Sequence, residues 1–155
     1  MPEKSRLALE QSPCHAAAMR KASRRLTQLY DEALAPSGLR NTQFTILAEL
    51  SRRVKDPPTM SQLAESLVMD RSALGHNLGP LERDGLILLE EGEEDRRRRY
   101  VTMTSEGKAR LKRAARFWQA AQNRFHEVYG ITAAATLRST LLGIAYNERL
   151  GTLHD

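Results

Sequence analysis

The stretch that decides the fold runs from Ser61 to Lys108 and reads SQLAESLVMDRSALGHNLGPLERDGLILLEEGEEDRRRRYVTMTSEGK. Its apolar spacing predicts one short helix over Ser61–Leu67 and a second over about Arg71–Asp84. Only Val68-Met69 separates the first helix from Asp70, a good N-cap for the second. Two short helices joined by so brief a turn predict a helix-turn-helix.

Both helices carry further signals. Thr59-Met-Ser-Gln62 is a capping box that starts the first helix. In the second, Leu74, Leu78 and Leu81 form a narrow stripe that should face the core. The opposite face is small and polar and carries Ser72, His76, Gly79 and Arg83, with Ala73, Gly75 and Pro80 at its margins. Such a face suits a helix pressed against a nucleic-acid groove, although Pro80 is expected to bend the helix.

After Gly85 the pattern changes from helices to strands. Leu86–Leu89 and Tyr100–Thr104 are short β-prone runs, and the residues between them are highly charged. Four consecutive arginines, Arg96–Arg99, lie on the returning side. The sequence therefore predicts a hairpin with a charged tip.

Outside this stretch, helices are predicted over about Pro13–Ala35, Thr42–Arg53 and Ser105–Tyr129, and a last helix is predicted to be capped by Thr132. The resulting fold class is mainly α with a small β hairpin, in the order α-α-α-α-β-β-α-α. The long helix carries a near-heptad seam suited to a helix partner: Leu111, Ala115, Trp118, Gln122, Phe125 and Tyr129. The terminal helices are therefore expected to form a homodimer.

Length and composition exclude several classes of protein. The 155 residues suit a single domain over 1–155, and a net charge of +5 favours anionic partners. One cysteine excludes an internal disulfide framework and a multi-cysteine zinc site. We find neither a signal peptide nor a membrane span, so a cytoplasmic protein is expected. Because the histidines are scattered and no catalytic motif is present, we expect no enzyme activity, no cofactor and no metal.

The residues from Leu63 to Gly107 closely resemble the winged helix-turn-helix of MarR-family transcriptional regulators. The likeness is carried by MDRSAL, by LERDGLI, and by D-x-R followed by V-T-M-T-x-x-G. It implies a winged helix-turn-helix core over about 42–104 and dimerisation helices over about 13–36 and 105–150. It further implies a homodimer on a palindromic double-stranded DNA operator, a repressor function, and release of DNA by a small phenolic or aromatic effector or by an oxidant.

The resemblance places DNA contacts on the second helix. Arg71 is expected at a phosphate, Ser72 and His76 at base edges or phosphates, and Ala73 at a thymine methyl group. Arg83 shares this outer face. The alternative for His76 is an ordinary solvated position.

The wing is expected to place Arg97 in the minor groove, oriented by a salt bridge from Asp95. Arg96, Arg98 and Arg99 would then contact the DNA backbone. The alternative is that the arginines are only a solvated charge run.

An effector pocket is expected between the first two helices, the long helix and the DNA-binding lobe. Arg20 and Arg24 are candidates to pair with a ligand carboxylate, and Tyr30 and Trp118 to form an aromatic wall. The alternatives are that the two arginines are exposed helix charges and that Trp118 belongs to a dimer seam.

Two other functions stay open. One is an oxidant-sensing regulator of the same fold that works through Cys14. The other is a winged-helix module for protein interaction, whose basic residues only solubilise the chain.

Overall fold

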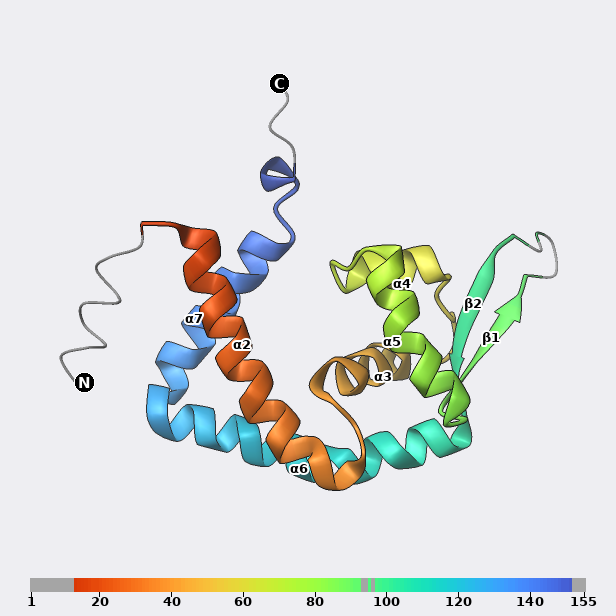
Figure 1. Cartoon of the computed structure of the whole chain (residues 1–155), viewed down its shortest axis with the longest axis horizontal. Helices are drawn as coiled ribbons and strands as arrows, with labels where there is room; N and C mark the ends of the chain where they lie inside the picture. The colour runs from red at the N-terminus through yellow and green to blue at the C-terminus, as the bar shows by residue number, and fades with distance from the viewer. Residues whose placement is uncertain (1–12, 93–94, 96, 152–155) are drawn as a thin grey trace.

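The computed structural model describes residues 13–92, 95 and 97–151 (Figure 1). Its elements, in chain order, are α2 (His15–Leu34), a 3-10 turn (Ala35–Ser37), α3 (Asn41–Arg52), α4 (Met60–Ser66), α5 (Arg71–Arg83), β1 (Ile87–Glu91), β2 (Arg99–Met103), α6 (Ser105–Tyr129), α7 (Ile131–Ala145) and a 3-10 turn (Glu148–Leu150). This order confirms the predicted mainly α fold with a small β hairpin.

The long helix α6 joins two groups of elements. Figure 1 shows α2 and α7 beside its C-terminal half, and α3, α4, α5 and the hairpin above its N-terminal half. We call the first group, with that half of α6, the helical lobe, and the second group the winged lobe. Among the described residues, no single helix is long and apolar enough to cross a membrane; α6 and α7 together pass that test but are bent by 108°.

The core of the winged lobe is built from leucines on consecutive elements. Leu74, Leu78 and Leu81 of α5 are buried, as the leucine stripe predicted, and they pack with Leu63 of α4. Ile87 and Val101 of the hairpin are also buried in this core. The apolar face of α5 is thereby fixed inward, and its polar face is left outward.

The helix-turn-helix begins with the predicted caps. Thr59 Oγ1 accepts a hydrogen bond from the Gln62 backbone N–H at 3.2 Å, and the Thr59 N–H donates to Gln62 Oε1 at 2.8 Å. Asp70 Oδ1 accepts from the Ala73 N–H at 2.7 Å and so caps α5. Although Pro80 lies inside α5, the helix continues to Arg83.

The hairpin strands pair antiparallel, from Ile87 opposite Met103 to Glu91 opposite Arg99. The segment before α4 also pairs with β2, because Thr59 bridges Tyr100 and the Val101 N–H donates to the Pro58 carbonyl at 2.9 Å. Sequence reasoning missed this third extended segment. It ties the start of α4 directly to the wing.

One prediction for the terminal helices was wrong. The N-cap of α7 is Gly130, with no side-chain cap, and Thr132 lies inside the helix. The seam predicted to face a helix partner does meet helices, and part of it packs on α3 and α2 of the same chain. Trp118 stacks on Phe44 at a ring-centroid distance of 5.8 Å, and Gln122 accepts a hydrogen bond from Tyr30. The heptad spacing identified a shared face but not the element that covers it.

Candidate nucleic-acid interface

The outer face of α5 presents the residues that the sequence assigned to DNA contacts. Ser72, His76 and Arg83 are exposed, while Ala73 is half-buried. A Cβ atom added to Gly75 or Gly79 would meet nothing within 4 Å. The face is therefore shallow, and packing within the protein does not require either glycine.

The tip of the wing is shaped by Asp95. Its Oδ1 accepts the Arg97 backbone N–H at 3.0 Å, and its carbonyl accepts the Arg98 N–H at 2.9 Å. Its carboxylate lies 3.9 Å from the Arg98 guanidinium. The predicted salt bridge to Arg97 is wrong: Asp95 holds the backbone of Arg97 and pairs with Arg98, so the Arg97 side chain is oriented by the turn. Arg96 lies outside the described residues.

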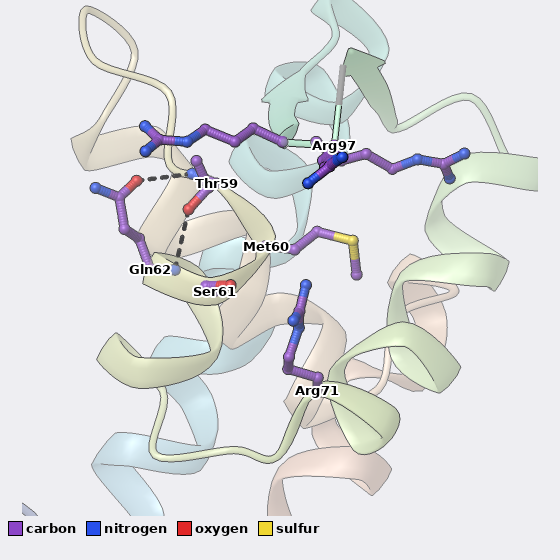
Figure 2. A pocket seen from close by; sticks show the side chains of 8 residues that line it. Thr59, Met60, Ser61, Gln62, Arg71 and Arg97 are labelled. Atoms are coloured by element: carbon purple, nitrogen blue, oxygen red, sulfur yellow. Dashed lines mark hydrogen bonds between the residues drawn. The ribbon is translucent and has the colours of Figure 1, made fainter. Parts of the chain in front are cut away.

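Arginines from α5 and the wing meet at one hollow of about 400 Å³ (Figure 2). Its lining comes from the start of α4, the first residue of α5, the turn of the wing and the first residue of β2: Thr59, Met60, Ser61, Gln62, Arg71, Arg97, Arg98 and Arg99. Figure 2 shows the Arg71 side chain directed from α5 past Met60 toward the wing. We call this hollow the arginine hollow.

The arginine hollow suits phosphate oxygens. Guanidinium groups bind phosphate through charge-assisted and bidentate hydrogen bonds, and the hydroxyls of Thr59 and Ser61 add neutral donors. No carboxylate is found among the described residues that line it. Sequence reasoning proposed Arg71 and Arg97–Arg99 but missed the contribution of Thr59–Gln62. The capping box marked that segment only as a helix start.

The sequence profile of the MarR family matches residues 37–98 of this chain. The transcriptional regulator MosR of M. tuberculosis, solved in complex with DNA, is 33% identical and superimposes with a TM-score of 0.79 over 90% of this chain and 99% of that one. The chain belongs to the MarR family of transcriptional regulators. This membership confirms the predicted family and the expectation that the protein is not an enzyme.

Two further relatives carry opposite functional descriptions. The transcriptional activatory protein BadR of Rhodopseudomonas palustris is 38% identical over 77 residues, which are 49% of this chain and 44% of BadR. The match therefore spans less than half of BadR. The repressor CouR of Rhodococcus jostii RHA1, bound to a 23-mer DNA duplex, is 27% identical, with a TM-score of 0.77 over 88% of this chain and 95% of that one.

The helical lobe of this MarR protein contains a second hollow, of about 770 Å³. Three of the four predicted effector residues, Arg20, Tyr30 and Trp118, line it. Arg24 does not: its Nε donates to the Arg20 carbonyl at 3.2 Å. The second predicted helix contributes Asn41 at the start of α3, and none of the described residues of α4, α5 or the hairpin lines the hollow, so the expected contribution of the DNA-binding lobe is wrong. Leu137 and Leu141 of α7 form a wall that sequence reasoning missed. We call this space the apolar hollow.

Tyr30 is the polar centre of the apolar hollow. Its hydroxyl donates to Gln122 Oε1 at 2.6 Å, and burial raises the pKa of its phenol above the ordinary value of 10.0. The phenol is therefore a neutral hydrogen-bonding group at physiological pH. Cys14 lies apart, as the exposed N-cap of α2, and its side chain makes no cap hydrogen bond.

Proposed function

We propose that this MarR-family protein binds a palindromic DNA operator as a homodimer, through α5 and the wing of each protomer. The observation that carries the proposal is the arginine hollow, where Arg71 of α5 and Arg97–Arg99 of the wing converge. A duplex seated on α5 places its backbone beside this hollow, because the wing flanks the start of the same helix. The DNA-bound relatives MosR and CouR support this reading.

In this arrangement α5 enters the major groove. Ser72 and His76 face base edges, and Arg71 faces a backbone phosphate. The open space at Gly75 and Gly79 lets the helix backbone approach the groove closely. Arg97 enters the neighbouring minor groove, whose negative potential favours a guanidinium group. With so few long side chains on α5, much of the sequence preference comes from DNA shape and from the wing.

The homodimer is proposed to form through the helical lobe. Large apolar side chains remain exposed there, at the end of α6 and along α7 and the turn that follows it: Val128, Tyr129, Ile131, Leu142, Ile144 and Leu150. So much exposed apolar surface marks an interaction face. Pairing of two identical faces gives twofold symmetry, and this matches an inverted repeat in the operator.

The apolar hollow is proposed to bind a small aromatic acid that releases the DNA. Trp118 and the leucines of α7 supply apolar contacts, Tyr30 supplies a hydrogen bond, and Arg20 supplies a cation for a carboxylate. CouR is known both with a DNA duplex and with p-coumaroyl-CoA. A repressor released by such a ligand is the function we favour.

A coupling experiment tests the wing. Arg97→Ala is titrated by fluorescence anisotropy against the duplex that wild type prefers, and against the same duplex with its wing-facing A·T pairs changed to G·C. Wild type should bind the first duplex several-fold more tightly than the variant does, and the base change should cost the variant less. Equal losses for both proteins would refute minor-groove reading by Arg97. No saturable binding by wild type at about 0.15 M salt would favour a protein-interaction module.

A further inference from the structure

The turn of the helix-turn-helix contains a strained residue. Helix α4 ends in a Schellman motif, in which the Met69 N–H donates to the Ala64 carbonyl at 2.9 Å and the Val68 N–H donates to the Glu65 carbonyl at 3.1 Å. Val68 occupies the left-handed position of this motif with φ 51°, where glycine is usual. The turn that sets α5 against α4 is therefore under local strain.

A hydroxyl from the other end of the chain contacts this turn. Tyr146, the C-cap of α7, donates from its hydroxyl to the Ser66 carbonyl at 2.8 Å, across 80 residues of sequence. Ser66 is the last residue of α4, so its carbonyl is among those that a helix leaves without an internal partner. The hydrogen bond thus completes the end of α4 with a group from the helical lobe.

This contact joins the helical lobe to the winged lobe at a point far from α6. Helix α6 connects the two lobes along one side of the molecule, and the end of α7 reaches α4 on the opposite, open side (Figure 1). The Tyr146–Ser66 bond therefore spans the lobes where α6 does not hold them. Upstream on α7, Leu137 and Leu141 line the apolar hollow. One helix thus contacts both the apolar hollow and the recognition turn.

We infer that Tyr146 is a positioning residue that fixes the orientation of the α4–α5 unit relative to the helical lobe. Its hydroxyl holds the strained turn at Val68 in place, and a displacement of α7 breaks the bond and releases the turn. The link from the apolar hollow to the recognition helix rests on the proposed function. The link from Tyr146 to the turn rests on the hydrogen bond alone.

Tyr146→Phe tests the inference because it removes the hydroxyl and keeps the ring. Thr140→Val is the matched control, since it removes an exposed hydroxyl from the same helix α7, where Thr140 Oγ1 donates only within the helix, to the Thr136 carbonyl at 3.1 Å. Amide hydrogen exchange is measured at Val68 and Met69, whose N–H groups close the Schellman motif. Loss of one hydrogen bond should raise their exchange rates about two- to tenfold in Tyr146→Phe. The control should leave them unchanged. Equal rates in Tyr146→Phe and wild type would overturn the inference.

A second readout tests positioning rather than local capping. The ratio of affinities is measured for the preferred operator and for the same operator with one base pair inserted between its half-sites. Wild type should discriminate strongly, and Tyr146→Phe several-fold less, because its two recognition helices are held less firmly. Faster exchange with an unchanged ratio would reduce Tyr146 to a local cap and overturn the positioning role. If wild type binds no DNA, the proposed operator function fails, and the exchange measurement still decides whether Tyr146 holds the turn.

Discussion

Replacing Arg71 with alanine should weaken DNA binding through the loss of one phosphate contact per protomer. Arg71 is exposed and, among the described residues, forms no ion pair. Its removal should therefore change the free energy of unfolding by no more than about 0.5 kcal/mol. Any large effect on affinity then reports on the interface and not on folding.

The magnitude follows from counterion release. Each phosphate contact contributes about 0.9 to the slope of log K against log salt concentration, so a dimer loses about 1.8 when both copies are removed. A fourfold rise in salt concentration lowers the affinity of both proteins. The fold-loss should be about ten times smaller for the variant than for wild type. The assay is fluorescence anisotropy with a duplex of the preferred sequence at four or more salt concentrations.

Arg124→Ala is the matched control. It removes the same charge from α6 in the helical lobe, where Arg124 makes, within the described part of the chain, one exposed ion pair, with Glu127 at 3.4 Å. Its salt slope should equal that of wild type. Equal slope changes in the two variants would show that net charge alone matters, and an unchanged slope in Arg71→Ala would remove Arg71 from the interface.

Four further substitutions test stability. Gly107→Ala should lower the melting temperature sharply, because the added Cβ atom would collide with the Leu86 carbonyl and lie 2.8 Å from Met103 Cγ. Gly143→Ala should instead raise the free energy of unfolding by up to about 1 kcal/mol, because its added Cβ atom would meet nothing within 4 Å. Val68→Gly should raise the free energy of unfolding in urea by about 1 kcal/mol, because it relieves the left-handed conformation at φ 51°, and a loss of stability would contradict the strain. The raised pKa of Tyr30 means that the folded chain retains a proton that the unfolded chain loses, so stability should fall as pH rises above 10.0; urea titrations should show a smaller fall for Tyr30→Phe.

The helix-turn-helix could be predicted from the sequence because its signals are local. Thr59, Gln62 and Asp70 make their cap hydrogen bonds within three residues along the chain, and the leucine stripe of α5 follows from helical periodicity. The boundaries of α4 and α5 therefore agree with prediction to within one residue.

The remaining features depend on contacts between distant segments. The Thr59–Tyr100 bridge places the start of α4 beside the wing. It requires a strand pairing that the local sequence of neither segment predicts. The choice of Arg98 over Arg97 as the partner of Asp95 follows from the backbone of the turn. Trp118 meets Phe44 because α3 lies against α6. In each case residue type indicated the chemistry, and tertiary geometry determined the partner.

The most direct test of the central claim is selection of random duplex DNA by the purified protein at about 0.15 M salt, followed by sequencing of the retained pool. A dimer that uses α5 and the wing should enrich an inverted repeat whose half-sites lie about one helical turn apart. A pool without an enriched repeat, from a protein that sediments as a folded species, would contradict operator recognition by this protein.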